Sequence, residues 1–138
     1  MGKLSVIVER TKDGFSVYAE NEPFAGMGST EVEAIADMQA GIKFYIKTAK
    51  ERGYRYNSYL DDDFEIDLKY DIPSILEYYG NFITDVGMEK LTGISKTQIW
   101  RYTHGKAKPR TSQVRKIVDG LSRFGSELST IALDVRKL

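Results

Sequence analysis

The sequence predicts an α+β fold of two lobes: an N-terminal β-β-β-α-β lobe, in which one helix packs on a small sheet, and a following all-α lobe. Three observations support this fold class. Strand-like alternation of apolar and polar residues dominates the chain before residue 73. Two short helices joined by a glycine turn are predicted after it, and the charge of the chain changes sign between the two parts. We therefore expect one domain over residues 1–72 and another over 73–138.

The formal net charge of zero conceals the difference between the two parts. Through Pro73 the chain carries nine Lys or Arg and fourteen Asp or Glu, a net charge of −5. From Ser74 onward it carries eleven and six, a net charge of +5. Two halves of opposite sign suggest two lobes with different partners.

The composition is that of an ordinary globular protein, with 41% hydrophobic and 29% charged residues over 138 positions. No cysteine is present, which excludes disulfides, thiolate metal ligands and a cysteine nucleophile, and favours a reducing compartment. The first apolar run is interrupted by charge and resembles no signal peptide, and no stretch reaches membrane-spanning length. We expect a cytoplasmic protein without a membrane partner.

Four strands are predicted in the first lobe. Lys3–Arg10 alternates apolar and polar residues, and the Asp13-Gly14 turn returns the chain as Phe15–Glu20. Phe24–Gly28 predicts a third, short strand weakened by two glycines. The fourth, Phe64–Tyr70, alternates strictly, as a strand with one exposed face does.

One long helix is predicted between the third and fourth strands. Thr30 and Glu33 form a capping box that opens a helix over Glu31–Arg52, and Gly53 ends it. Its apolar stripe is expected to cover one face of the sheet. The stripe consists of Val32, Ile35, Ala36, Met38, Ile42, Tyr45, Ile46 and Ala49.

The second lobe is organised around Met88–Pro109. Gly93 separates two short helices, because glycine takes positive φ at little cost, and Ser95 is a natural N-cap for the second, Lys96–His104. Ser74 is expected to cap a helix ahead of this pair. Thr111 or Ser112 is expected to cap one behind it, ending at Gly125.

The helix over Lys96–His104 has two different faces. Ile99, Tyr102 and Thr103 share the face expected to pack inward. The opposite face is cationic and aromatic, which suits approach to a phosphate backbone and to base edges. The stretch from Lys90 to Val118 contains eight Lys or Arg and no Asp or Glu, whereas a merely solvated surface helix more often mixes both signs. The residues expected to contact DNA are Ser95, Lys96, Thr97, Gln98, Trp100, Arg101, His104, Lys106, Lys108 and Arg110.

Two residues on this face have alternative interpretations. Trp100 is either partly buried against the interface between the two lobes or free to pack on a sugar or a thymine methyl. His104, the one histidine, is better explained as a surface residue near a phosphate than as a catalytic base.

The stretch resembles the helix-turn-helix of the lambda-repressor-like family. The resemblance rests on Met88, Leu91, Gly93, Ile94, Ser95, Ile99, Tyr102, Gly105, Lys106, Lys108 and Pro109, while Glu89 stands where that family usually has a small residue. In that family the first, second and sixth residues of the recognition helix commonly touch bases. The resemblance therefore implies base contacts from Lys96, Thr97 and Arg101.

The C-terminal tail is compatible with two conformations. Ile131, Leu133 and Val135 alternate with polar or small residues as in a strand, yet Leu128, Ile131 and Ala132 also fit a helix. A terminal strand is expected to pair with a second copy across a two-fold axis, which gives a dimer and a second recognition helix.

Catalytic and metal-binding groups are scarce. No pattern of a Ser-His-Asp catalytic triad can be recognised in the sequence, and one histidine without cysteine makes a zinc site improbable. Asp61, Asp62 and Asp63 offer oxygen ligands for a divalent cation, but adjacent carboxylates repel one another, so a solvated turn is the better interpretation. We expect no enzyme activity, no cofactor and no bound metal.

The order of the parts resembles the HicB antitoxins across nearly the whole chain. A β-β-β-α-β lobe with a glycine-containing third strand leads into Thr30, Glu33 and Ala34, and a lambda-repressor-like lobe follows. The resemblance implies a first lobe like a truncated ribonuclease H fold that covers a HicA-type toxin, a small basic ribonuclease that cleaves messenger RNA. It also implies a second lobe that binds the promoter of its own operon.

The charge of the first lobe is compatible with such a partner. A net charge of −5 suits the masking of a cationic RNA-binding surface, since opposite potentials orient association. The expected toxin contacts are Glu20, Glu22, Asp61, Asp62 and Asp63.

Two alternative functions keep other roles for the first lobe. A one-component transcriptional repressor would use it to sense a small ligand in a concave apolar pocket. A nuclease would need carboxylates that converge at one end of the sheet and activity that depends on a metal.

Overall fold

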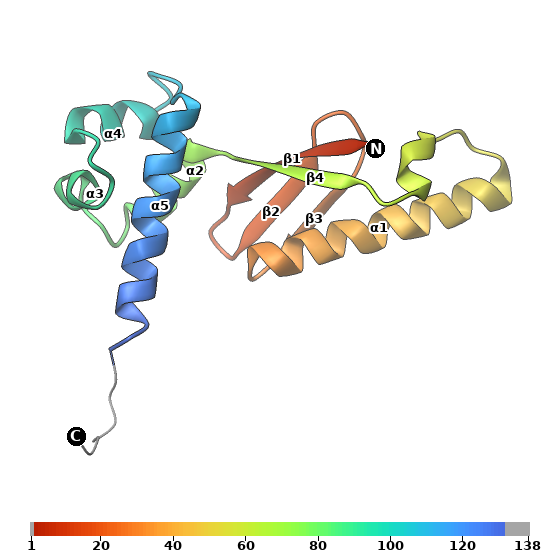
Figure 1. The fold of residues 1–138 in the computed structure, drawn as a ribbon, viewed down its shortest axis with the longest axis horizontal. Helices are drawn as coiled ribbons and strands as arrows, with labels where there is room; N and C mark the ends of the chain where they lie inside the picture. The colour runs from red at the N-terminus through yellow and green to blue at the C-terminus, as the bar shows by residue number, and fades with distance from the viewer. Residues whose placement is uncertain (1, 132–138) are drawn as a thin grey trace, which may run out of the picture. The chain divides into compact units, whose positions relative to one another are not determined.

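The computed structural model describes residues 2–131 and divides the chain into two compact units, Met1–Tyr78 and Tyr79–Leu138. Within the described residues there are four strands, five α-helices and one short 3₁₀-helix, so the fold is mixed α+β as predicted (Figure 1). The division falls at the end of the first short helix of the second half rather than before it, beyond the 72/73 boundary expected from the sequence.

The first unit is a four-stranded sheet with one long helix. The strands are β1 (Lys3–Arg10), β2 (Phe15–Ala19), β3 (Ala25–Gly28) and β4 (Glu65–Tyr70), in the spatial order β3-β2-β1-β4. Helix α1 (Glu31–Arg52) lies between β3 and β4 in the chain, so the predicted β-β-β-α-β order is confirmed. β1 pairs antiparallel with β2 and parallel with β4, because α1 crosses back over the sheet before β4 begins.

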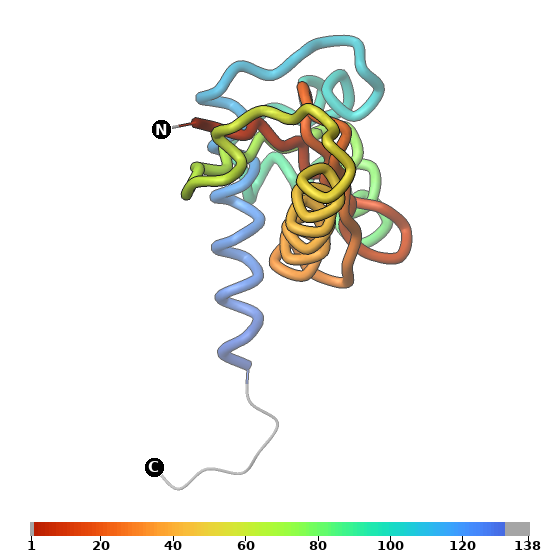
Figure 2. The backbone as a smooth tube through the Cα atoms, turned by 90° about the vertical axis from the view of Figure 1, so that its right-hand side faces the viewer, coloured from red at the N-terminus to blue at the C-terminus, as the bar shows by residue number. Residues whose placement is uncertain are grey.

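The core of this unit lies between α1 and one face of the sheet. Val6 and Val8 of β1 and Val17 of β2 are fully buried, and they pack with Met38 and Ile42 of α1. Figure 2, turned by 90° from Figure 1, looks nearly along α1 and shows it against one side of the strands. The alternate residues of each strand point to the opposite face.

The two glycines of β3 allow α1 to approach the sheet closely. A Cβ at Gly26 would lie 2.3 Å from the carbonyl oxygen of Ala34, and one at Gly28 would lie 2.6 Å from Cβ of Glu33. Both glycines face the helix, since each pairs with a β2 residue whose side chain points into the core. The glycines that weaken β3 as a strand are therefore what lets the helix cover it.

The ends of α1 lie where the sequence predicted them, but the Glu33 carboxylate bonds the amide before the N-cap residue rather than that of Thr30 itself. Thr30 accepts a hydrogen bond from the Glu33 amide at 3.1 Å, and the Glu33 carboxylate accepts from the Ser29 amide at 2.9 Å. Gly53 ends the helix with a φ of 72°. The buried face differs from the predicted stripe, however: Ala34 is buried, whereas Val32 is 77% exposed and Ala36 is also exposed. The close contact at the glycines turns Ala34 toward β3, and Val32 then points away.

A short helix, α2 (Ile72–Tyr79), follows β4 directly. Its N-terminus is capped by Asp71, whose carboxylate accepts from the Ser74 amide at 3.2 Å, so Asp71 rather than Ser74 is the cap. The Ser74 hydroxyl instead accepts from the Arg10 amide at 3.1 Å, and the Arg10 guanidinium lies over the Tyr78 ring at 3.7 Å. These contacts tie α2 to the end of β1.

The second unit contains three further helices, α3 (Asp85–Thr92), α4 (Lys96–Thr103) and α5 (Thr111–Leu128). Helix α5 continues past Gly125, where the sequence predicted its end, because that glycine keeps a negative φ and does not break the helix. Both views show α5 as one unbroken helix (Figures 1 and 2).

The chain beyond α5 is described only as far as Ile131. Ser129 and Thr130 form a turn, so the helix does not extend into the tail there. The predicted dimerisation segment, residues 129–136, lies mostly outside the described residues. In the part of the chain that the structure describes, no helix has the length and apolar composition needed to cross a membrane.

We predict that Gly26→Ala destabilises the first unit, because its Cβ would clash with the backbone of α1 at Ala34 and Met38. Gly41→Ala is the matched control: nothing lies within 4 Å of the added Cβ, and Ala is favoured over Gly in a helix by about 1 kcal/mol. In urea unfolding followed by circular dichroism, Gly26→Ala should lower the urea concentration at the midpoint, and Gly41→Ala should raise it. Equal stability of the two variants would contradict the close contact between β3 and α1.

Candidate nucleic-acid interface

The α3–α4 pair is joined by a tight turn with a single left-handed residue. Gly93 has a φ of 76°, and its amide donates to the Glu89 carbonyl at 2.8 Å, which closes α3. The Thr92 side chain is buried, donates to the Met88 carbonyl at 2.7 Å and accepts from the Ile94 amide at 3.1 Å. The turn therefore has its internal polar groups satisfied, and it fixes where α4 begins.

Two side chains cap the N-terminus of α4. Ser95 accepts from the Gln98 amide at 3.2 Å, as the sequence predicted. The Glu89 carboxylate reaches from α3 and accepts from the Lys96 amide at 2.8 Å. A carboxylate at a helix N-terminus also interacts favourably with the helix dipole. Glu89 thus joins the two helices of the pair, a role that sequence reasoning missed.

The two faces of α4 separate as the sequence predicted. Ile99 and Tyr102 are 1% and 3% exposed, while Thr103 is half-buried and donates to the Ile99 carbonyl at 2.8 Å. The five residues of the other face are all exposed, and Gln98 is half-buried between the two faces. The exposed residues are Lys96, Thr97, Trp100, Arg101 and His104.

Trp100 and His104 form a stacked pair on the exposed face. Their ring centroids are 4.2 Å apart with an interplanar angle of 24°, and Nδ1 of His104 lies 2.8 Å from the Trp100 carbonyl oxygen. Trp100 remains 46% exposed. One turn of helix therefore presents a flat aromatic surface to solvent, on the face that also carries the exposed Arg101.

The segment after α4 continues the basic surface. His104 and Gly105 close the helix, Gly105 with a φ of 69°, and the Lys106 amide donates to the Arg101 carbonyl at 2.8 Å. Lys106, Lys108 and Arg110 are all exposed, and Arg110 occupies the N-cap position of α5. The predicted DNA-contacting residues thus lie on α4, its cap and the segment that follows it.

Helix α5 packs against α3, the other helix of the pair. Ile117 is fully buried, and a Cβ at Gly120 would lie 2.5 Å from the Leu91 carbonyl oxygen, so α5 packs closely on α3. Met88 and Ile94 complete the buried centre of the unit at 1% and 3% exposure. The exposed residues of α4 are therefore held on a packed support.

The predicted toxin-contacting residues lie at one end of the sheet of the first unit. Glu20 follows β2, and its amide donates to the Ser5 carbonyl of β1 at 2.9 Å. Its carboxylate pairs with Lys69 of β4 at 3.0 Å. Glu22 accepts from Asn57 and, at 3.2 Å, from the Tyr59 hydroxyl, which connects the β2–β3 loop to the 3₁₀-helix η1 (Ser58–Asp61).

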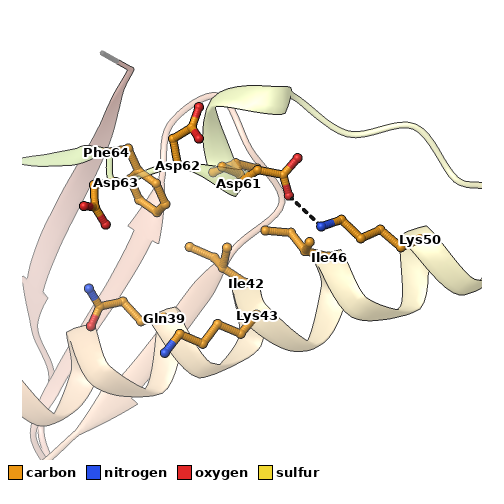
Figure 3. A pocket seen from close by; sticks show the side chains of 10 residues that line it. Gln39, Ile42, Lys43, Ile46, Lys50, Asp61, Asp62, Asp63 and Phe64 are labelled. Carbon is orange, nitrogen blue, oxygen red and sulfur yellow. Dashed lines mark ion pairs between the residues drawn. The ribbon is translucent and has the colours of Figure 1, made fainter.

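The three consecutive aspartates point in different directions. Asp61 pairs with Lys50 of α1 at 3.2 Å, and the hydrogen bond from the Lys50 ammonium to this carboxylate raises the pKa of Lys50. Asp61 also accepts from the Tyr56 hydroxyl. Asp62 and Asp63 are exposed and turn away from Asp61, as Figure 3 shows. Within the described residues, no group of three or more Asp, Glu, His or Cys side chains is arranged to hold a metal ion.

An open groove of about 500 Å³ lies between α1 and these aspartates (Figure 3). Ile42, Ile46 and Phe64 form its floor, while Lys43, Lys50 and the three aspartates line its rim. The groove is therefore mixed in polarity, unlike the apolar pocket that a small-ligand sensor would need.

Comparison of the chain with protein-family models, with curated proteins and with solved structures found no match.

We predict that Ser95→Ala lowers the stability of the second unit by about 1 kcal/mol, because the Gln98 amide loses its cap. Ser126→Ala, at an exposed position of α5, is the control and should leave stability unchanged or slightly raised. Thermal unfolding followed by Trp100 fluorescence reports on this unit directly. Identical melting of the two variants would contradict the capping role of Ser95.

Proposed function

We propose that the chain is an antitoxin that represses its own operon, binding promoter DNA through α4 and neutralising a HicA-like ribonuclease toxin through its first unit. The observation that carries the proposal is the exposed cationic and aromatic face of α4, set on a buried apolar face. In this proposal α3, the Gly93 turn and α4 form a helix-turn-helix, and α4 is the recognition helix.

The base contacts are assigned to three residues on the exposed face of α4. Lys96 and Thr97 begin the helix, and Arg101 lies just over one turn after Thr97 on the same exposed face. Arg and Lys side chains read guanine through its O6 and N7 atoms, and a threonine methyl contacts the methyl group of thymine. These three residues supply the sequence preference.

The aromatic pair is assigned to a sugar or a thymine methyl, and the following loop is assigned to the phosphates. The stacked Trp100 and His104 rings offer a flat surface for a sugar or a thymine methyl, and His104 lies at the end nearest the basic segment. Lys106, Lys108 and Arg110 neutralise phosphates, which adds affinity without sequence preference.

The first unit is assigned to the toxin by its charge. Glu20 and Asp61 already pair with lysines of their own unit. Asp62 and Asp63 are exposed, and among the described residues no ion pair engages them. These two carboxylates are therefore the ones best placed to attract the cationic surface of a ribonuclease.

A one-component repressor with a ligand-sensing first unit is the alternative, and it shares the same α4. The charged rim and open form of the groove beside α1 favour a macromolecular partner over a small apolar ligand. A thermal shift of the first unit with metabolites would favour the alternative.

Arg101→Ala should cost roughly 1 to 3 kcal/mol in binding to the operator and relax specificity at one base, because it removes a base contact. Lys106→Ala should weaken binding to all DNA similarly and reduce the slope of log affinity against log salt by about one, because it removes a phosphate contact. Lys43→Ala, an exposed charge of α1, is the control and should change neither. Anisotropy titrations with operator and random duplexes measure all three.

Two results would count against these roles. If Arg101→Ala and Lys106→Ala lost affinity equally on both duplexes, the division between base and phosphate contacts would be wrong. If both variants bound as the Lys43→Ala control does, α4 would not be the DNA-binding surface.

The toxin assignment predicts a short basic neighbouring reading frame that is toxic when expressed alone and is rescued by this chain. Affinity of the purified pair should fall between low and high salt, and the double variant Asp62→Lys/Asp63→Lys should weaken it further than Glu51→Lys, an exposed charge change on α1. Biolayer interferometry at two salt concentrations measures both effects. A pair with unchanged affinity at high salt would contradict the electrostatic assignment.

A further inference from the structure

Strand β4 is an open edge of the sheet. The Glu65 amide donates to the Gly2 carbonyl at 3.0 Å, and the Asp71 amide donates to the Val8 carbonyl at 2.8 Å. In a parallel pair of this register, Asp67 and Lys69 also direct their backbone N–H and C=O groups toward β1. The backbone N–H and C=O groups of Ile66, Leu68 and Tyr70 therefore point away from β1, toward the open edge. Among the described residues, no backbone or side-chain partner is found for these outward amides.

The opposite edge of the sheet, β3, is protected from pairing with another strand, whereas β4 is not. Strand β3 has four residues, and the outward amide of Met27 donates to the Asp37 carboxylate of α1 at 3.0 Å. Just beyond the strand, Glu33 accepts from the Ser29 amide. Covering or blocking an edge prevents pairing with another chain, and β4 has neither device along its six residues.

The side chains of β4 are also incompletely covered. Ile66, Leu68 and Tyr70 point to the helix side of the sheet but are only half-buried, whereas their β1 neighbours Val6 and Val8 are fully buried. A strand added to the edge would cover this apolar row.

We propose that β4 pairs antiparallel with β4 of a second copy of this chain, about a two-fold axis at Leu68, to give a continuous eight-stranded sheet. A two-fold axis makes both partners use the same surface, so the strand has to be complementary to itself. This inference does not depend on the proposed function, because it uses neither the exposed residues of α4 nor the carboxylates of Asp62 and Asp63.

One register makes the strand complementary to itself. Pairing Leu68 with Leu68 places Ile66 opposite Tyr70, so all the outward backbone groups meet and the apolar row becomes continuous. The same register places Asp67 opposite Lys69 twice, once on each side of the axis. Opposite charges in directly facing positions stabilise antiparallel pairs.

Neighbouring registers lose this match. An axis at Asp67 places that carboxylate opposite itself, and an axis at Lys69 places two ammonium groups opposite each other. A shift by one residue turns the side chains of the second copy to the other face and misaligns the outward backbone groups.

The ends of the strand are compatible with the pairing. Glu65 and Asp71 would face each other, but Glu65 pairs with Lys3 at 3.9 Å and the Asp71 carboxylate accepts from the Ser74 amide. The hydrogen bond from the Arg10 amide to the Ser74 hydroxyl directs α2 toward β1, away from the open edge.

The absence of cysteine allows a direct test in the full-length chain. Leu68→Cys places two thiols at the axis, where Cα atoms in a hydrogen-bonded antiparallel pair are about 5.5 Å apart, within disulfide range. Mild oxidation should convert most of the Leu68→Cys chain to a covalent dimer, while Met27→Cys on the protected edge should stay largely monomeric on a non-reducing gel. Circular dichroism confirms that both variants fold. Equal cross-linking of the two variants would overturn the proposal.

Charge substitutions test the register independently. Asp67→Lys should weaken self-association about tenfold in analytical ultracentrifugation, since it creates two facing Lys pairs. The swap Asp67→Lys/Lys69→Asp should restore association, because the loss of the Glu20–Lys69 ion pair is common to monomer and dimer. Glu51→Lys is the control of equal charge change. A chain that is monomeric at tens of micromolar, or equal weakening by Asp67→Lys and Glu51→Lys, would overturn the proposal.

Discussion

The left-handed turn at Gly93 is the constraint on which the second unit depends. It allows α3 to end and α4 to begin within a few residues, and the buried Thr92 hydroxyl and the Glu89 carboxylate satisfy the backbone groups that the turn exposes. With its start fixed, α4 places Ile99 and Tyr102 in the core, so the intervening residues have to face solvent. The chemistry of the exposed face follows from this division: it carries Lys96, Trp100 and Arg101, and there is no carboxylate on the helix itself.

The first unit depends on a comparable close contact. Gly26 and Gly28 bring α1 onto the edge strand β3, and the acidic side chains of the first turns of α1 then reach the backbone amides of Met27 and Ser29. One packing contact thus closes one edge of the sheet and leaves the opposite edge, β4, open. The charge of this unit also opposes that of the second, which is why two different partners are proposed for one chain of zero net charge.

Sequence patterns predicted the elements better than their contacts. The capping box at Thr30 and the glycine at 93 mark local backbone requirements, so the bounds of α1 and the start of α4 could be placed from the residues alone. The burial of Ala34 in place of Val32 could not be predicted in this way, because it depends on how closely α1 packs against Gly26 and Gly28. Two other contacts also leave no pattern in the neighbouring sequence. They are the parallel pairing of β4 with β1 and the hydrogen bond from the Lys96 amide to the Glu89 carboxylate.

The function proposed for this chain requires the exposed face of α4 to meet the bases of duplex DNA. Thr97→Cys, the one thiol in an otherwise cysteine-free chain, can carry a photoactivatable cross-linker at the start of that face. Cross-linking of this variant to duplex DNA at physiological salt, mapped to a base and compared with Ser126→Cys on α5, measures the contact directly. We expect efficient cross-linking to a defined base from position 97 and little from position 126; equal, weak cross-linking from both positions would show that this face does not meet the bases.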